Sequence, residues 1–239
     1  GTDKIGALDW AAEKPIYQQI IAKYDEMAVE ADPAKKEAIS KEINELTVEA
    51  GKLSMPTEFS NLMESIGGKN VNAGTSFDLT YYHNSFPAYQ INKWLEISSQ
   101  RFMHPVFRSF QSELENVYEE YNMYQDNPSS VKSNFIRSKA FEGHPYSRDI
   151  IGLPEHLKNP RLSKLIEFYD SWYTPENMVL ILVGNVNAQQ ISGRINAAFG
   201  RLPKKATPAR KTYPDLDIKG RTQYTAKIGY YPSVVLVYK

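Results

Sequence analysis

Apolar residues recur at intervals of three and four through the first part of the chain, which is the pattern of amphipathic helices. One helix is predicted from about Ala11 to Glu30 and a second from Ala34 to Leu53. The segment ADPAK separates them, and in it Asp32 followed by Pro33 is typical of a helix N-cap with proline at the first helical position. The two helices are therefore predicted to form a helical hairpin whose polar faces are a charged, solvated surface.

The next segment, KNVNAGTSFDLTYYHNSF, changes to an alternation of apolar and polar positions. Val71, Ala73, Thr75 and the following alternate residues fall on one face, and Asn72, Gly74 and their alternates fall on the other. A period of two predicts a half-buried strand over Val71 to Tyr81.

The remaining pattern alternates helices with short apolar runs. The elements predicted from it are a helix from about Ala88 to Phe102, a helix from Ser163 to about Trp172, a strand MVLILVG, a helix capped by Asn187 and ended by Gly200, a linker LPKKATPARKTYPDLD, and strand-like residues in the closing TQYTAKIGYYPSVVLVYK.

One helix is unusual because it is rich in carboxylates. On a helical wheel of SELENVYEEYNMYQDNP, Glu113 and Glu120 sit together at the margin of the apolar stripe, where a carboxylate is expected to be partly desolvated. Glu115 and Glu119 fall on the opposite, solvated face. The residues of the apolar stripe are Phe110, Leu114, Val117, Tyr118, Tyr121 and Tyr124. A metal ligand or a base would be placed at this margin, but the alternative is structural: marginal glutamates that reach solvent, with Glu115 closing a capping box with Ser112.

Composition narrows the possible functions. The 239 residues are 41% hydrophobic and 12% aromatic, enough for a sizeable core. Lys plus Arg and Asp plus Glu both number 28, so the chain has no net positive charge that would attract nucleic acid or an anionic membrane. The absence of cysteine excludes disulfides and thiolate chemistry, and the apolar run MVLILV is too short for a membrane span. The compartment stays open.

The order of these segments resembles a known family, the zinc metallopeptidases of the pitrilysin, insulin-degrading enzyme and mitochondrial processing peptidase group, which carry an H-x-x-E-H motif. The resemblance covers most of the chain from Asn70 to Pro203. The matching motifs are NAGTS, SELENVYEEYNMYQDNP, HPYSRDIIGLPEHL, FYDSWYTPENMVLILVGNV and INAAFGRLP.

The resemblance implies roles for particular residues. In this family the later glutamate of such a pair ligates zinc and the earlier one supports the site, which maps onto Glu120 and Glu113. The edge of the NAGTS strand pairs with extended peptide in the family, which implies substrate binding by Asn72, Ala73, Gly74 and Thr75. The alternative for this segment is an ordinary edge strand that covers the core.

The H-x-x-E-H motif itself does not occur in these 239 residues. None of the four histidines, His83, His104, His144 and His156, has another histidine and a glutamate at the required spacing, and none is expected to be a catalyst. The family motif is followed closely by a segment like FKGT, and this chain begins GTDK, so we expect the sequence to start just downstream of the motif. The chain alone is then expected to be inactive.

The resemblance predicts an α+β fold, a mostly antiparallel sheet covered by helices. The expected divisions are residues 1–56 as a helical hairpin insertion, 57–205 as the first peptidase-family domain without its motif helix, and 206–239 as a linker with the first strands of a following domain. The expected partners are peptide substrates and a second family-type domain or subunit, and zinc is expected in the full-length protein rather than on this chain alone. Two functions remain open: part of a zinc endopeptidase, or a non-catalytic partner or scaffold subunit of the same fold.

Overall fold

The computed structural model describes residues 1–214, 220–229 and 231–238. These residues form two compact units, one made of residues 1–74, 80–110 and 159–209 and the other of residues 75–79, 111–158 and 210–239. We call them unit 1 and unit 2. None of the helices within the described residues combines the length and the apolar character that crossing a bilayer requires.

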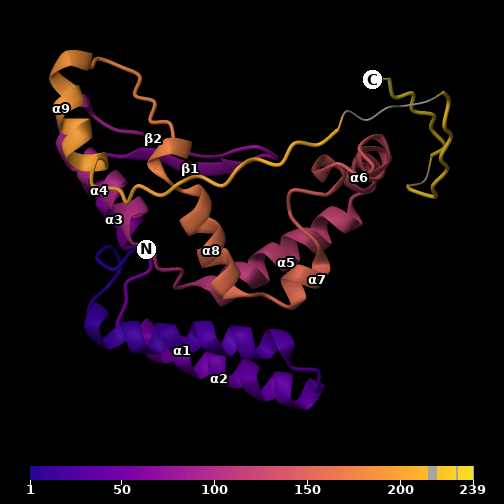
Figure 1. Cartoon of the computed structure of the whole chain (residues 1–239), viewed down its shortest axis with the longest axis horizontal. Coiled ribbons are helices and arrows are strands. Elements are labelled where there is room, and N and C mark those ends of the chain that lie inside the picture. Colours follow the sequence, from indigo (N-terminus) through magenta and orange to yellow (C-terminus); the bar gives the residue numbers. More distant parts are fainter. Residues whose placement is uncertain (215–219, 230, 239) are drawn as a thin grey trace. The chain divides into compact units, whose positions relative to one another are not determined.

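Unit 1 begins with the predicted helical hairpin. Helices α1 (Trp10–Val29) and α2 (Pro33–Gly51) lie side by side and antiparallel (Figure 1). Both N-caps are aspartates: Asp9 accepts a hydrogen bond from the Ala12 amide at 3.1 Å, and Asp32 accepts one from the Ala34 amide at 2.9 Å. These carboxylates satisfy amides that would otherwise lack partners in the first helical turn, so the prediction from Asp32 and Pro33 is confirmed.

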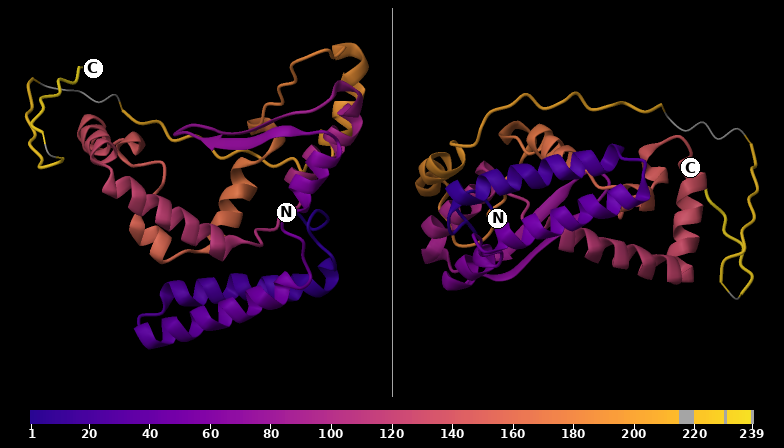
Figure 2. Two further views of the ribbon diagram at one scale, coloured as in Figure 1. Left: turned by 180° about the vertical axis from the view of Figure 1, so that it is seen from behind. Right: turned by 90° about the horizontal axis from the view of Figure 1, so that it is seen from below.

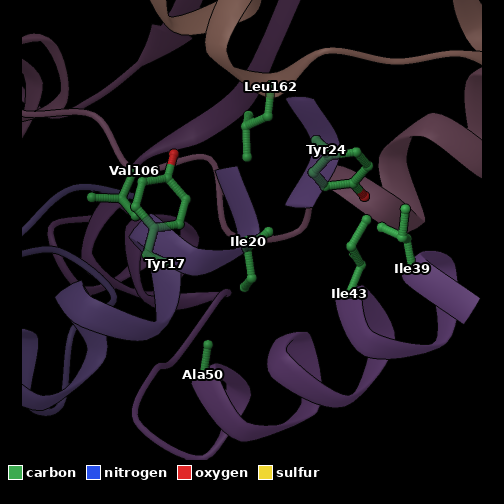
Figure 3. Close-up of a cluster of buried hydrophobic side chains, with 8 residues drawn as sticks. All are labelled: Tyr17, Ile20, Tyr24, Ile39, Ile43, Ala50, Val106 and Leu162. Carbon is green, nitrogen blue, oxygen red and sulfur yellow. The ribbon is translucent and has the colours of Figure 1, made fainter. Parts of the chain in front are cut away.

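A first hydrophobic cluster joins the hairpin to distant segments of unit 1. Its fully buried members include Tyr24 and Leu162, the latter at the start of α8 (Leu162–Trp172). Figure 3 shows the eight buried side chains, which are Tyr17, Ile20, Tyr24, Ile39, Ile43, Ala50, Val106 and Leu162. The hairpin therefore shares its core with α8 and with the segment around Val106, and truncating a residue such as Leu162 would cost roughly 2–5 kcal/mol.

A second hydrophobic cluster holds α3 (Glu58–Ser65), α4 (Ile91–Met103) and α9 (Ala188–Phe199) together. Trp94 is central, because its ring stacks on Phe86 at 4.7 Å and its indole N–H donates to Asn84 Oδ1 at 2.7 Å. The 3₁₀ turn η1 (Ala88–Gln90) leads into α4, and η3 (Pro175–Asn177) follows α8. The predicted helices that correspond to α4, α8 and α9 are confirmed, including the N-cap in which Asn187 accepts from the Gln190 amide at 3.1 Å, whereas α3 was not predicted.

The alternating segment forms a two-stranded antiparallel hairpin rather than one strand. Strand β1 (Lys69–Thr75) pairs with β2 (Thr80–Ser85), and the chain turns where the Ser76 amide donates to the Leu79 carbonyl at 2.8 Å. The single strand predicted from Val71 to Tyr81 is therefore wrong. The turn residues SFDL contain no glycine or proline, and the period of two continues through them, so the sequence carried no clear turn signal. Nor is the hairpin half-buried, since Val71 is 40% and Leu79 55% exposed.

Two further predicted strands are absent from the described residues. The segment 178–184 has no strand partner there, and Val179, Ile181 and Val183 are 86%, 76% and 93% exposed, while Leu182 packs on the second cluster. Residues 222–229 and 231–238 likewise form no strand. An apolar run supplies strand propensity, but a strand also needs a neighbour that satisfies its backbone hydrogen bonds. Asp215, Leu216 and Asp217 of the predicted linker, with Tyr230 and Lys239 of the closing segment, lie outside the described residues.

Unit 2 consists mainly of helices. Its elements are α5 (Phe110–Asp126), α6 (Pro128–Ala140), η2 (Pro145–Ser147) and α7 (Pro154–Lys158), and the views in Figure 2 show α5 leading directly into α6. Asn127 caps α6 by accepting from the Ser129 amide at 2.9 Å, with Pro128 at the first helical position. The chain thus combines helices with antiparallel strands, and the predicted α+β class is confirmed.

Candidate functional site

Helix α5 carries the residues on which the sequence reasoning concentrated. Its predicted apolar stripe is half-buried from Phe110 to Tyr121, whereas Tyr124 is 41% exposed. Glu113, Glu115, Glu119 and Glu120 are all exposed, so the expected partial burial of Glu113 and Glu120 is not met. The helix begins at Phe110, which places Ser112 inside it, and Glu115 accepts a hydrogen bond from the Gln111 side chain at 2.8 Å. The proposed capping box between Ser112 and Glu115 is therefore wrong.

The structure places Glu113 and Glu120 on one face of α5. Seven residues are close to two full helical turns, which separates the two Cα atoms by about 10 Å along the axis and leaves both side chains pointing in nearly the same direction. Glu115 and Glu119 project from other faces of the same helix. The spacing thus presents two accessible carboxylates in one line on a regular scaffold.

Glu120 has a hydrogen-bond partner one turn further along the helix. The Tyr124 hydroxyl donates to Glu120 Oε1 at 3.0 Å, and this bond raises the pKa of Tyr124. Residues four apart in a helix lie one above the other, so a phenol at this position can reach back to the carboxylate. In the sequence pattern Tyr124 belongs to the apolar stripe, and nothing in that pattern indicates the hydrogen bond from its hydroxyl to Glu120.

A polar pocket of about 280 Å³ in unit 2 opens beside the same tyrosine. Asp149 is its charged member, and its carboxylate is paired with Arg137 at 3.1 Å and hydrogen-bonded by the Asn134 side chain. The lining residues are Tyr124, Ser129, Ser130, Ser133, Asn134 and Asp149. Because Arg137 offsets the charge of Asp149, hydroxyl and amide groups set the chemistry of this pocket.

The predicted substrate-binding residues lie on the exposed hairpin. Asn72, Ala73 and Thr75 are exposed, and Gly74 is half-buried beneath the ring of Tyr81. A Cβ at Gly74 would come within 2.5 Å of the Tyr81 ring, which explains the glycine in the NAGTS motif. Within the described residues β1 pairs only with β2, so one edge of β1 keeps its backbone donors and acceptors available. Asn72 to Gly74 belong to unit 1, and Thr75 belongs to unit 2 with the two glutamates.

The histidine in the HPYS loop has a structural role. His144 Nδ1 accepts from the Tyr146 amide at 3.2 Å and so caps the 3₁₀ turn η2. The His144 ring also packs against Tyr146 and Tyr213 at centroid distances of 4.6 and 5.0 Å. His144 is therefore held in place by Tyr146 and Tyr213.

The donor set was tested against the requirements of zinc, which takes three protein ligands in a catalytic site. Throughout residues 1–214, 220–229 and 231–238, no three His, Cys, Asp or Glu side chains are grouped closely enough to hold a metal ion. Glu120 by itself fits a single ligand position, since it is exposed and one carboxylate oxygen is already oriented by Tyr124. The described residues therefore contain no complete metal site, and Glu120 is a candidate for a single ligand position.

Comparison with known families assigns most of the chain. A family described as "Insulinase (Peptidase family M16)" matches residues 31–153, more than half of the 239 residues. The chain belongs to peptidase family M16. A second match, described as "Peptidase M16 inactive domain", covers residues 161–238. The family resemblance inferred from the sequence is thereby confirmed.

Two relatives of this M16 chain are named as zinc proteases. Zinc protease PqqE of Helicobacter pylori is 28% identical over 180 residues, which cover 72% of this chain and 40% of that protein. Probable zinc protease PqqL of Escherichia coli is 27% identical over 162 residues, which cover 63% of this chain and 17% of that protein. The chain thus spans well under half the length of either relative.

Solved structures agree on the fold. A protease from Helicobacter pylori has a TM-score of 0.58 and 27% identity, and the match covers 65% of this chain and 38% of that one. The first half of the periplasmic protease PqqL from Escherichia coli has a TM-score of 0.56 at 24% identity, and the match covers 64% of this chain and 35% of that one. The M16 peptidase fold is therefore the fold of this chain.

Proposed function

We propose that this chain is part of a zinc-dependent endopeptidase, with Glu120 as a zinc ligand and Glu113 as a supporting carboxylate. The observation that carries the proposal is the presence of two accessible glutamates in one line on α5, in a chain of family M16 with relatives such as PqqE and PqqL that are named as zinc proteases. The other ligands and the general base would lie outside these 239 residues, where the family's H-x-x-E-H motif is expected. The chain alone is then inactive.

Each residue has a definite task in this proposal. When bound, zinc supplies Lewis-acid chemistry toward the peptide carbonyl and an activated water. The Glu120 carboxylate would hold the metal through its anionic oxygen. The Tyr124 hydroxyl would fix the rotamer of that carboxylate, as partners of ligating groups commonly do. Glu113, two turns away on the same face, would add negative charge and hydrogen-bond acceptors beside the site.

The exposed hairpin is proposed to hold the peptide. The backbone of Asn72, Ala73, Gly74 and Thr75 on β1 offers an edge to which an extended segment can add as a further strand. Binding of this kind depends on main-chain hydrogen bonds, so it tolerates varied side chains. Peptides N-methylated at the amides that face β1 should bind more weakly than unmethylated peptides of the same sequence.

The domain divisions expected from the sequence, residues 1–56, 57–205 and 206–239, form part of the same proposal. A second family-type domain or subunit would complete the enclosure around the peptide. One of the similar structures is described as the first half of PqqL, which implies that PqqL has two halves. This supports a two-part arrangement here.

The test compares four glutamates in the protein that carries its natural upstream segment. Glu120→Gln should lose most zinc and nearly all turnover of a quenched peptide, because an amide lacks the anionic oxygen that offsets the metal's charge. Glu113→Gln should retain more zinc yet lose roughly 10- to 100-fold in turnover. Glu115→Gln and Glu119→Gln are the matched controls and should change little. A sensitive Glu119 beside a silent Glu120 would refute the assignment.

Tyr124→Phe tests the orienting bond separately. The variant removes one hydroxyl from an exposed position, so the fold should be unaffected, while zinc affinity measured by competition with a chelator should fall by roughly 10-fold or more. Tyr121→Phe on the same helix is the control. Equal zinc affinity in both variants would show that Tyr124 does not orient the ligand.

A second candidate function is a non-catalytic partner or scaffold subunit of the same fold. The match of residues 161–238 to a domain described as inactive is consistent with it. The residues encoded immediately upstream of Gly1 discriminate between the two functions: an H-x-x-E-H motif there supports the peptidase, and any other sequence supports the scaffold.

A further inference from the structure

In unit 1, aromatic side chains surround Arg101 on α4. Its guanidinium lies over the ring of Phe59 from α3 at 4.6 Å and over the ring of Tyr82 from β2 at 4.1 Å. Tyr173 belongs to the same group, because its hydroxyl lies 3.4 Å from that of Tyr82. Tyr169 stacks on Tyr173 with ring centroids 4.2 Å apart. We call Arg101, Tyr82, Tyr169 and Tyr173 the arginine–tyrosine cluster.

The hydrogen-bonding capacity of this cluster is largely unused. Across the described part of the chain, Arg101 forms no ion pair and no hydrogen bond, although a guanidinium carries five N–H donors. The buried hydroxyl of Tyr169 also lacks a hydrogen-bond partner within the same residues. Buried polar groups are normally paired, so the unpaired Tyr169 hydroxyl calls for an explanation, and the partly exposed Arg101 guanidinium keeps its donors available to solvent or a ligand.

Arg108, seven residues further along the chain, differs from Arg101 because it has a carboxylate partner. Its guanidinium is buried but binds both carboxylate oxygens of Glu13, at 2.6 and 2.9 Å. Burial lowers the pKa of Arg101 and raises the pKa of Tyr82 to about 12, so the surroundings of the cluster resist additional charge of either sign unless it is compensated. The Phe59 and Tyr82 rings stabilise this cation but accept none of its N–H bonds, so Arg101 keeps donors for a ligand.

Solvent and ligand can reach the Arg101 end of the cluster, because Tyr82 is 37% exposed and Arg101 is only half-buried, whereas the Tyr169 hydroxyl is buried. We propose that the arginine–tyrosine cluster is a carboxylate-binding site, with the Arg101 guanidinium and the Tyr169 hydroxyl as its donors. A carboxylate is planar and singly charged, so it matches one guanidinium, which can donate to both of its oxygens. The aromatic rings around Arg101 would exclude water from that contact and strengthen it.

Two sources can supply this chemistry, the C-terminal carboxylate of a peptide and the side chain of an aspartate or glutamate. The site lies in unit 1 and uses none of the residues assigned to the metal or to the strand edge. It is therefore independent of the proposed peptidase activity, and a binding measurement on the 239-residue chain tests it without zinc.

The experiment follows the side-chain Nε–Hε signals of the arginines by NMR during titration with three acetylated alanine peptides. One peptide has a free C-terminus, one is its C-terminal amide, and one is an amide with a single internal glutamate. A saturable shift of the Arg101 signal with the first or the third peptide, and none with the plain amide, is expected. Which of the two shifts the signal identifies the source of the carboxylate.

Variants separate binding from folding. Arg101→Met should lose the saturable response yet unfold at the same temperature as the parent or higher, since an apolar side chain suits the aromatic surroundings. Tyr169→Phe should weaken binding by roughly 10-fold while preserving stability, and Arg101→Lys should bind weakly because it lacks the planar fork. Arg148→Met, an exposed arginine in unit 2, is the control for net charge and should bind as the parent does.

Two results would overturn the proposal. One is an Arg101 signal that responds equally to all three peptides or to none. The other is an Arg101→Met variant that is unfolded or clearly less stable while Tyr169→Phe binds normally, because Arg101 would then serve packing alone.

Discussion

The ion pair between Glu13 and Arg108 is expected to contribute strongly to the stability of unit 1. Glu13 in α1 is 1% exposed and Arg108, which follows α4, is 7% exposed. Arg108 Nε and one terminal nitrogen donate to the two carboxylate oxygens at 2.6 and 2.9 Å, and its other terminal nitrogen lies 3.4 Å from the Ile5 carbonyl. The pair thus fixes the first residues, α1 and the loop after α4 to one another.

Replacing Glu13 by Gln leaves the buried guanidinium without its counter-charge. Breaking a buried pair in this way costs about 3–5 kcal/mol, and the retained amide oxygen can still accept one hydrogen bond, so about 3 kcal/mol is expected for Glu13→Gln. For a domain of this size, that loss corresponds to a fall of roughly 6–12 °C in melting temperature. The double variant Glu13→Leu/Arg108→Met should recover most of the loss, since it leaves no charge unpaired.

Urea unfolding followed by tryptophan fluorescence measures this loss directly. Trp10, Trp94 and Trp172 all lie in unit 1, and the ring of Trp10 lies 5.8 Å from the Arg108 guanidinium. Arg161→Met is the control, because Arg161 pairs with Asp25 at 3.4 Å and is 44% exposed, so less than about 1 kcal/mol should be lost. The reasoning fails if Glu13→Gln costs no more than this control, or if the double variant is as unstable as Glu13→Gln.

Two further predictions concern glycine substitutions in β1 and α9 and the titration of Tyr82 in β2. Gly74→Ala should displace the Tyr81 ring and destabilise unit 1 by up to about 1 kcal/mol. Gly193→Ala, in an open position inside α9, should stabilise unit 1 by a similar amount. Urea unfolding should therefore give changes of opposite sign in the free energy of unfolding for the two variants. Burial and the bond to Tyr173 raise the pKa of Tyr82 from 10.0 to about 12, so its contribution to stability is complete below pH 10 and is lost as the pH rises through 12. Tyr82→Phe should therefore flatten the fall in stability between about pH 10 and about pH 12, and an unchanged slope would show that another group is responsible.

The sequence determined the local elements and the family. The periodicity of three and four placed α1, α2, α4, α8 and α9 within three residues, because amphipathic helices are specified by their own side chains and by caps such as Asp32 and Asn187. The spacing of Glu113 and Glu120 on one helix was readable for the same reason. Family membership followed from the order of short motifs, which needs no coordinates.

Only the tertiary structure decided which distant residues meet and which strands exist. Glu13 and Arg108 are 95 residues apart, and no local pattern marks them as a pair. The same holds for Arg101, Tyr82 and Tyr169, which come from three separate elements. Alternation alone could not reveal the turn at residues 76–79 or the lack of a partner for residues 178–184, because a strand is completed by hydrogen bonds to another segment. Local propensity is encoded within a few residues, whereas pairing depends on where the folded chain brings its segments together.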